Sequence, residues 1–274
     1  MKLVHTQAEL TVALQINKGS IGFVPTMGAL HAGHASLLRR SKKENTVSVL
    51  SIFINPTQFG PNEDLLRYPR TLEADLEVAR EDKADIVYVP TVEEIYPPGF
   101  SSFIEVGAVA QPFCGAFRPG HFRGVATVVA RFFGLVKPTR AYFGEKDIQQ
   151  CLVIQRMVHD LALSVELVFC PTLREADGLA MSSRNRYLTN EEREVAPQIY
   201  KTLVEVKEKI QAGEKSVEKL LLEAQKKLSQ KFKLQYMELR SYPDLSTLET
   251  VNGKCVLAVA AYLGPTRLID NILI

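Results

Sequence analysis

Apolar and polar positions along the first two thirds of the chain predict strands separated by helices. Short apolar runs that predict buried strands occupy residues 21–24, 47–54, 85–89, 140–143 and 165–169. The spacing of amphipathic helices is found at residues 33–44, 72–83, 125–136 and 147–161. An earlier helix, expected to be the first element, follows a capping box formed by Thr6 and Glu9 and ends at Gly19. This alternation is typical of parallel βαβ units and predicts a Rossmann-like, doubly wound α/β sheet.

The pattern changes near residue 175. Thr189 and Glu192 cap a predicted long charged helix, and a second helix is expected at 217–232. Strand-like runs follow at residues 234–239, 255–263 and 268–274. Helices followed by strands favour a smaller C-terminal α+β domain, so we expect two domains, 1–175 and 176–274.

Composition and charge exclude several classes of function. The chain has 33 Lys plus Arg against 31 Asp plus Glu, and its net charge of +2 does not favour nucleic acid as the main partner. Its strongest apolar run, residues 47–54, is too short to cross a bilayer. The four cysteines, at positions 114, 151, 170 and 255, form no C-x-x-C pair. We therefore expect a cytoplasmic protein with buried, reduced thiols.

The loop after the first predicted strand, PTMGALHAGH at residues 25–34, leads into a helix. Helix N-termini favour phosphate, and imidazoles such as those of His31 and His34 can donate hydrogen bonds to charge developing on a phosphoryl group. Two histidines at this spacing are also compatible with a metal site, or with one histidine capping the turn while the other packs. The string H-x-G-H resembles the HIGH signature of adenylate-forming nucleotidyltransferases, which favours nucleotide binding.

Other polar loops follow later predicted strands. Lys146 can place a point charge on phosphate oxygens, and Gln150 lies one turn into the next helix. Arg118 and Arg123 suit a carboxylate or a phosphate. Small hydroxyls beside Arg184, on a mobile junction, can close over a triphosphate. Taken alone, the Arg118 loop is equally typical of a basic turn, and the loop around Arg184 is more typical of a capped turn. Capping of the next helix by Asp147 is compatible with a functional Lys146.

Read together, five segments resemble the signature blocks of the pantothenate synthetase family, in its order and with its spacing. They are PTMGALHAGH, NPTQFGPNED, RPGHFRGV, FGEKDIQQ and READGLAMSSRNRYL, and the match extends to the closing TRLIDNILI. The resemblance implies a nucleotide- and pantoate-binding domain, a C-terminal lid domain and a cytoplasmic homodimer. It also implies ATP-dependent condensation of (R)-pantoate with β-alanine through a pantoyl adenylate, with release of pyrophosphate and AMP. Pantothenate is a precursor of coenzyme A, and Mg²⁺ is expected to arrive with ATP rather than in a dedicated metal site.

The resemblance also implies roles for particular residues. Gln58 and Gln150 bind pantoate, and Gln58 also lies near β-alanine. His34 is the general acid, while His31 and Lys146 stabilise charge. The implied ATP site consists of Met27, Gly28, Ala29, Leu30, His31, Ala32, Gly33, His34, Gly144, Glu145, Lys146, Asp147, Leu173, Met181, Ser182, Ser183 and Arg184.

One position departs from the family pattern, and two rival functions remain. Cys114 stands where the family often has an acidic residue, which puts that carboxylate's role in placing the second substrate in doubt; a packed, inert thiol is the simplest interpretation. A nucleotidyltransferase acting on a phosphate ester is disfavoured by the neutral pair Gln58 and Gln150. A non-catalytic nucleotide sensor is disfavoured by the retained His31, His34 and Lys146.

Overall fold

A computed structural model describes residues 1–16, 19–61 and 63–274 of the chain. Two residues of the first predicted helix, Asn17 and Lys18, lie outside the described residues, as does Asn62 in the loop after the second predicted strand. The first compact unit comprises residues 1–106, 118–145 and 153–171. The second comprises residues 107–117, 146–152 and 172–274. The border at residue 175, as a limit between independently folding domains, stays a prediction.

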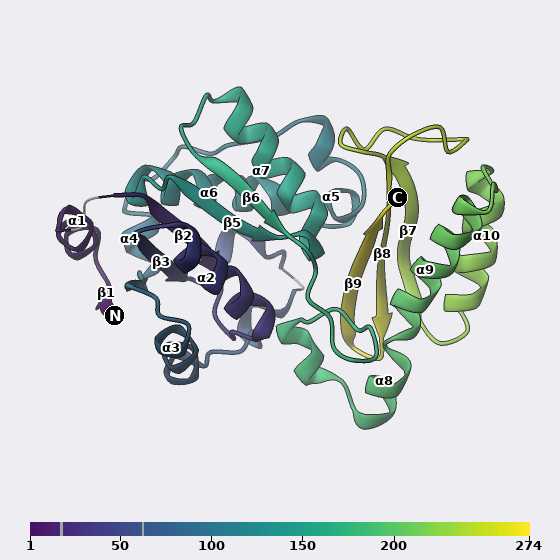
Figure 1. The fold of residues 1–274 in the computed structure, drawn as a ribbon, viewed down its shortest axis with the longest axis horizontal. Coiled ribbons are helices and arrows are strands. Elements are labelled where there is room, and N and C mark those ends of the chain that lie inside the picture. The colour runs from purple at the N-terminus through teal and green to yellow at the C-terminus, as the bar shows by residue number, and fades with distance from the viewer. Residues whose placement is uncertain (17–18, 62) are drawn as a thin grey trace. The chain divides into compact units, whose positions relative to one another are not determined.

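In its described part, the first unit contains a six-stranded parallel sheet with the order β1-β4-β3-β2-β5-β6 (Figure 1). The strands are β1 (Lys2–Val4), β2 (Ile21–Thr26), β3 (Val47–Ile52), β4 (Ile86–Tyr88), β5 (Arg140–Gly144) and β6 (Glu166–Cys170). From β2 the chain proceeds to one side through β3 and β4, and later to the other side through β5 and β6. The junction of β2 with β5 is therefore the topological switch point, and the predicted doubly wound α/β fold is confirmed.

Helices between the strands bury both faces of this sheet. They are α1 (Gln7–Gln15), α2 (Ala32–Glu44), α3 (Leu72–Glu81), α4 (Val92–Ile95), α6 (His121–Val136) and α7 (Ile148–Asp160), of which 148–152 belong to the second unit. Short 3-10 turns are η1 (Pro56–Gln58) and η2 (Asp64–Leu66). Val24 packs in one cluster with Leu38 of α2 and Leu76 of α3. Phe23, one residue earlier, points to the opposite face, where its ring meets Phe132 of α6 edge-on at 5.6 Å.

The N-terminal part of this sheet differs from the prediction. The chain begins with β1 rather than with a helix; this strand spans three residues, of which only Val4 is buried, so it gives no periodic signal. Strand β2 continues past Val24 through Pro25. Its pairing with β5 is confined to Gly22 and Phe23, so the missing N–H of Pro25 leaves no gap on that side.

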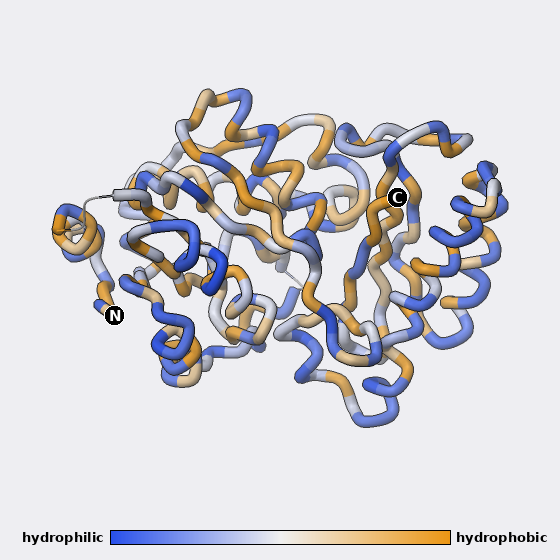
Figure 2. Tube along the Cα trace, viewed as in Figure 1, coloured by the Kyte–Doolittle hydropathy of each residue, from blue (hydrophilic) through white to orange (hydrophobic). Residues whose placement is uncertain are grey.

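The second unit contains, among its described residues, a three-stranded antiparallel sheet with the order β7-β8-β9. Its elements are η3 (Ala108–Ala110), α5 (Cys114–Phe117), η5 (Ser183–Tyr187), α8 (Asn190–Val195), α9 (Gln198–Gln211), α10 (Val217–Leu228), β7 (Lys233–Ser241), β8 (Cys255–Leu263) and β9 (Thr266–Leu273), with η4 (Glu145–Asp147) shared between the units. Helices α9 and α10 carry both orange and blue stretches in Figure 2, as amphipathic helices do. The predicted smaller α+β unit is confirmed.

Both faces of this second sheet are covered. Leu203 of α9 and Leu220 of α10 share a core cluster with Leu257 of β8. On the other face, Tyr236 of β7 stacks on Phe113, with ring centroids 5.6 Å apart. Strand β8 is therefore buried at every position except Tyr262, a pattern that a one-sided sheet would not produce.

The single long helix predicted after Thr189 is wrong. The capping box of Thr189 and Glu192 is present, but α8 ends at Val195 and α9 begins at Gln198. Pro197 lies between them. Because proline has no backbone N–H to donate, it divides the charged stretch into two helices.

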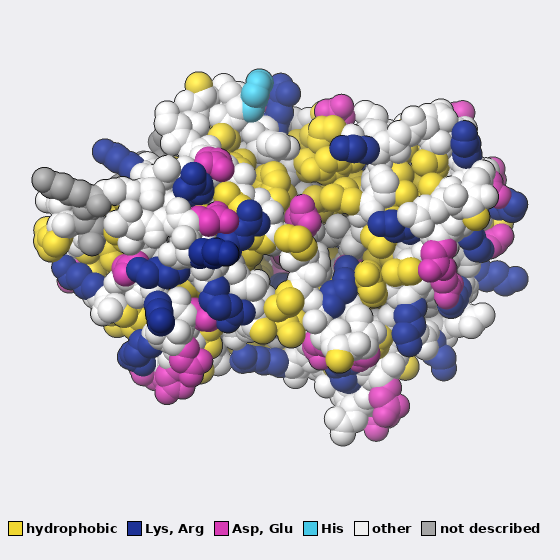
Figure 3. Space-filling model, in the orientation of Figure 1, with side chains coloured by type: hydrophobic (Ala, Val, Ile, Leu, Met, Phe, Trp, Pro, Cys, Tyr) yellow, Lys and Arg dark blue, Asp and Glu magenta, His cyan; other side chains and the backbone are white. Residues whose placement is uncertain are grey.

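The surface and the thiols agree with the composition. Figure 3 shows Lys and Arg side chains interspersed with Asp and Glu on the face in view. No helix within residues 1–16, 19–61 and 63–274 is long and apolar enough to span a membrane. All four cysteines are buried and unbridged, as predicted.

The core of the second unit yields a stability prediction. Leu203 is fully buried, so Leu203→Ala should lower the free energy of unfolding by about 2–5 kcal/mol through lost apolar contact and the cavity left behind. The matched control, Leu222→Ala on α10, removes a side chain that is 66% exposed and should change it by less than about 0.5 kcal/mol. Urea denaturation followed by circular dichroism measures both. Equal losses would mean that Leu203 is not a core residue.

Candidate active site

The loop between β2 and α2 has a constrained backbone. Gly28 and Ala29 both lie in the left-handed region, with φ of 81° and 50°. A Cβ at Gly28 would lie 2.9 Å from a carboxylate oxygen of Asp75 and 3.1 Å from the side chain of Ile52. Glycine is therefore required at position 28 both for its conformation and for space. Ala29 adopts its conformation at a cost of roughly 1–2 kcal/mol.

The carboxylate of Asp75, in α3, holds this loop. It accepts hydrogen bonds from the backbone N–H groups of Ala29 at 2.9 Å and Leu30 at 2.7 Å, and from the Thr71 hydroxyl at 3.2 Å. Asp75 is only 2% exposed, so these charge-assisted bonds form away from competing water. The two N–H groups fix the loop rather than standing open to a ligand.

Sequence reasoning missed Asp75. One signal was available, since Asp75 lies on the same helix face as Leu76 and Ala79, and both of these are buried. A carboxylate on a buried helix face needs partners, and that requirement marks it as a residue to examine.

His31 and His34 form a capping box at the start of α2. His31 Nδ1 accepts from the Gly33 N–H at 3.1 Å, and His34 Nδ1 accepts from the His31 N–H at 3.4 Å. Their ring centroids are 4.1 Å apart. A backbone N–H can only donate, so each neutral ring carries its proton on Nε2. His31 thus caps the helix as one interpretation required, but His34 also accepts a backbone N–H rather than only packing, and in both neutral rings Nε2 is the donor nitrogen.

The loop after β5 emerges beside this one. Strands β2 and β5 are neighbours, paired at Phe23 and Ala141, and both run in the same direction. Gly144 ends β5 and Glu145 follows it in the first unit. The segments 27–34 and 144–145 thus follow adjacent strands at the switch point, where nucleotides bind in sheets of this kind.

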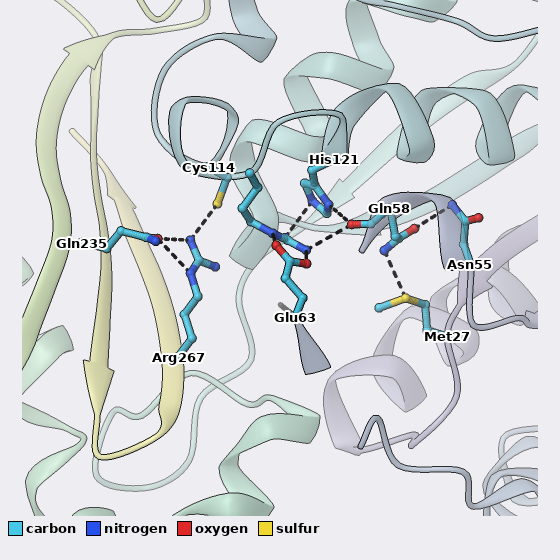
Figure 4. Close-up of polar contacts among 9 residues, drawn as sticks. Met27, Asn55, Gln58, Glu63, Cys114, His121, Gln235 and Arg267 are labelled. Atoms are coloured by element: carbon cyan, nitrogen blue, oxygen red, sulfur yellow. Dashed lines mark hydrogen bonds and ion pairs between the residues drawn. The ribbon is translucent and has the colours of Figure 1, made fainter. Parts of the chain in front are cut away.

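Gln58 lies in η1, after β3, and is 9% exposed. Its Oε1 accepts from Asn55 Nδ2 at 3.1 Å, and its Nε2 donates to the Met27 sulfur at 3.1 Å (Figure 4). The structure thus brings together two of the predicted site residues, Gln58 and Met27. A thioether is a weak acceptor, so a ligand oxygen would be a better partner for this amide.

Residues of the RPGHFRG segment hold the backbone of Gln58 (Figure 4). The Gln58 carbonyl oxygen accepts from His121 Nδ1 at 2.8 Å and from Arg118 at 3.3 Å. Arg118 also forms two hydrogen bonds with Glu63, at 2.7 and 2.6 Å. Burial acts to raise the pKa of Glu63, but the hydrogen bonds and charge of Arg118 outweigh it and lower this pKa. Arg118 and His121 thus position Gln58.

In the second unit, Lys146 and Asp147 occupy η4 and Gln150 lies in the first turn of α7. The Lys146 ammonium is 3.7 Å from the Asp147 carboxylate. The side chain of Gln149 is committed to backbone groups of segment 107–117: it accepts from Cys114 N–H and donates to the carbonyls of Val109 and Pro112. Gln149 is buried, whereas Gln150 is partly exposed.

The segment from Leu173 to Arg184 is hydrogen-bonded within the second unit along its length. Met181 N–H donates to the Leu173 carbonyl at 3.0 Å, and the Ser182 hydroxyl caps η5 by accepting from Arg184 N–H at 3.2 Å. Ser183 is buried. The capped-turn interpretation of this segment is therefore confirmed for Ser182.

Cys114 is buried in the second unit, as the packed-thiol interpretation requires. Its sulfur lies 3.3 Å from the Tyr236 hydroxyl. The sulfur also lies 3.4 Å from Arg267, whose guanidinium donates to Gln235 (Figure 4). Burial raises the pKa of Tyr236 well above its usual value. The thiol thus belongs to a buried polar cluster.

Comparison with known proteins decides between the rival functions. The family model for pantoate-beta-alanine ligase matches residues 2–273. The chain belongs to the pantoate-β-alanine ligase family. It is therefore an enzyme, a ligase of pantothenate biosynthesis, and the identification made from the sequence motifs is confirmed.

Relatives support this membership along nearly the whole chain. A pantothenate synthetase from Thermosipho africanus is 51% identical to this chain, over 94% of this chain and 93% of the relative. A pantothenate synthetase from Roseiflexus sp. is 50% identical, over 99% of this chain and 98% of the relative. A crystal structure of pantothenate synthetase from Thermus thermophilus has a TM-score of 0.94 at 46% identity, covering 99% of both chains. A pantoate-β-alanine ligase from Francisella tularensis, described as complexed with beta-gamma ATP and β-alanine, has a TM-score of 0.82 at 36% identity, covering 100% of this chain and 97% of its own.

The buried carboxylate of Asp75 yields a prediction for this ligase. In Asp75→Asn, an NH₂ group replaces one acceptor oxygen and faces a backbone N–H that then has no partner. The free energy of unfolding should fall by about 1–3 kcal/mol. Glu77→Gln, on the exposed side of the same helix, should change it by less than about 0.5 kcal/mol. Denaturant titration of both variants measures this, and an Asp75→Asn variant as stable as the control would refute the role given to Asp75.

The pair formed by Glu63 and Arg118 predicts a pH dependence. The pKa of Glu63 is lower in the folded state than its ordinary value of 4.5, so the unfolded state takes up the proton first as pH falls. The pair's contribution is complete above that ordinary pKa and is lost as pH drops through the folded-state pKa. The stability difference between the wild type and Glu63→Gln should therefore be largest near neutrality and shrink on acidification. Denaturant unfolding at a series of pH values tests this, and a constant difference would contradict it.

Proposed function

We propose that the enzyme joins (R)-pantoate to β-alanine in two steps through a pantoyl adenylate, releasing first pyrophosphate and then AMP. The observation that carries this proposal is the histidine capping box at the switch point. It fixes Nε2 of His31 and His34 as hydrogen-bond donors at a helix N-terminus, which suits charge developing on a phosphoryl group.

In the first step, a carboxylate oxygen of pantoate attacks the α-phosphorus of ATP. The bond from that phosphorus to the bridging oxygen breaks, and pyrophosphate departs with its electron pair. Negative charge grows on the phosphate oxygens, where His31 and the Lys146 ammonium stabilise it. His34 acts as the general acid and gives its proton to an oxygen of the departing pyrophosphate. Mg²⁺ enters with ATP as part of the substrate.

In the second step, the amine of β-alanine attacks the carbonyl carbon of the mixed anhydride. The bond from that carbon to the phosphate oxygen breaks, AMP leaves, and the nitrogen loses a proton as the amide forms. The anhydride is required because a free carboxylate is a poor acyl donor at neutral pH.

The family resemblance assigns the substrate contacts, and the hydrogen bonds that neighbouring side chains already make to the protein support the assignment. Gln58 and Gln150 bind pantoate, and Gln58 also lies near β-alanine. The weak Met27 partner of Gln58 supports this assignment, as does the commitment of Gln149 rather than Gln150 to backbone groups. The beta-gamma ATP and β-alanine named for the Francisella tularensis ligase support ATP and β-alanine as substrates of this enzyme.

The remaining ATP contacts are those that the family resemblance implies. Residues 27–34, 144 and 145 belong to the first unit, and residues 146, 147, 173 and 181–184 belong to the second. Residues 176–274 act as a lid that protects the adenylate from water. The working enzyme is a cytoplasmic homodimer, an assignment that rests on the family resemblance.

The decisive experiment is pantoate-dependent exchange of labelled pyrophosphate into ATP without β-alanine. Exchange is expected because the first step is complete and reversible before the amine arrives. His34→Asn keeps an acceptor near the position of Nδ1, so the helix cap survives, but it lacks the Nε2 donor. Exchange should fall by about 100-fold or more, the usual loss when one donor to developing charge is removed.

The control is His159→Asn, which changes an exposed histidine of α7 and should leave exchange unchanged. Circular dichroism and thermal melting confirm that both variants are folded. Pantothenate synthesis by the wild type without any exchange would refute the adenylate. Full exchange by His34→Asn would refute the role of His34.

A further inference from the structure

Two adjacent polar residues are buried in strand β9 of the second unit. Asp270 is 4% exposed and Asn271 is 6% exposed, although apolar residues surround them in the strand. Burying such groups is unfavourable unless each has hydrogen-bond partners. Successive side chains point to opposite faces of a sheet, so the two residues reach different parts of the second unit.

Asp270 binds the segment that leads to Ser182 and Arg184. Its carboxylate accepts two hydrogen bonds from the Arg174 guanidinium, at 2.6 and 2.9 Å. The same guanidinium donates to the Gly178 carbonyl at 3.1 Å and lies 3.6 Å from the centre of the Tyr200 ring. Arg174 also pairs with Ala180 through a backbone bridge. The turn 174–180 is thus fixed at both its ends, immediately before residues 181–184.

Asn271 binds the other segment, on the opposite face of the sheet. Its side-chain N–H donates to the carbonyl oxygen of Lys146 at 2.8 Å. Arg267 lies four residues before Asn271 in the strand, so its side chain is on the same face of the sheet. It donates to the Cys114 sulfur of segment 107–117. Gln149 ties that segment to α7 through Cys114 N–H. The backbone at Lys146 is therefore held by a strand that lies 125 residues further along the chain.

The two anchoring residues, Asp270 and Asn271, are also hydrogen-bonded to each other. The backbone N–H of Asn271 donates to the Asp270 carboxylate at 2.8 Å, and the Asn271 carbonyl accepts from Arg174 at 3.4 Å. One short stretch of β9 therefore fixes the backbone of Lys146 and the turn before Ser182 relative to each other. Neither Asp270 nor Asn271 has a part in the chemistry proposed above.

We infer that Asp270 and Asn271 are positioning residues for nucleotide activation. They hold the Lys146 segment and the 181–184 segment of the second unit at fixed positions relative to each other. This inference rests on the proposed function, because it takes Lys146 and Arg184 as ligands of ATP. Catalytic groups must be held within fractions of an ångström, and a misplacement of about 1 Å can cost about 100-fold in rate. Removing an anchor should therefore slow adenylation, in addition to any effect on stability.

The test measures kcat and KM for ATP in pyrophosphate exchange, at a temperature well below the melting midpoint of every variant. Asn271→Ala removes the donor to the Lys146 carbonyl without adding charge. Asp270→Asn keeps the shape of the side chain but removes its negative charge and one of the two acceptors for Arg174. In each, kcat should fall by about 10- to 100-fold. Asn271→Ser retains a shorter donor and should recover part of the loss.

The matched control is Thr202→Val in α9. Thr202 is 1% exposed and its hydroxyl donates to the Gln198 carbonyl within the same helix, so this variant removes a buried hydrogen bond of the second unit that touches neither segment. It should lower the melting midpoint and leave kcat unchanged.

Each outcome bears on a distinct claim. Folded Asn271→Ala and Asp270→Asn enzymes with kcat and KM within twofold of the wild type would overturn the inference, and if either fails to fold, the other variant and Asn271→Ser decide. A loss of kcat in Thr202→Val as large as in Asn271→Ala would also overturn it, since any weakening of the unit would then suffice. Absence of exchange in the wild type would instead refute the proposed adenylation step.

Discussion

A buried carboxylate under the β2–α2 loop is the constraint on which the first unit's part of the site depends. Asp75 accepts the N–H groups of Ala29 and Leu30, and these bonds offset the cost of left-handed backbone at Gly28 and Ala29. The loop can then begin α2 at the correct place for the His31 cap. Because protein groups alone satisfy these bonds, the loop is preorganised, and binding energy from a nucleotide is not needed to form it.

Each of the two histidines combines a structural role, capping α2, with the chemical role proposed for it. The sequence allowed the two histidines to bind phosphate, to bind a metal, or to have one capping the turn while the other packs. Each ring has two nitrogens, and the bond to the backbone through Nδ1 places the proton on Nε2. Among the glutamines the roles are divided between neighbours, since Gln149 binds backbone groups and Gln150 is left partly exposed. Adjacent side chains on a helix point in different directions, so this division is expected.

The second unit is assembled from segments that are far apart in the chain. Residues 107–117 and 146–152 cover one face of its sheet, while α9 and α10 cover the other. This two-sided burial explains why β8 is apolar almost throughout. It also explains why polar residues such as Arg267 and Asn271 occur on β9, because the covering segments supply a thiol and a carbonyl oxygen as partners that water would otherwise provide.

The sequence by itself determined the family, the parallel sheet of the first unit apart from β1, and the helices and strands of the second unit apart from the break at Pro197, because periodicity and motif order are local properties of the chain. The tertiary structure alone decided which distant elements meet. β1 is visible only through its pairing with β4, and Asp75 gains its role from backbone amides 46 and 45 residues earlier. Similarly, Asn271 is explained only by the carbonyl of Lys146. Periodicity tells which face of an element is apolar, but the partner opposite that face is set by how the whole chain packs.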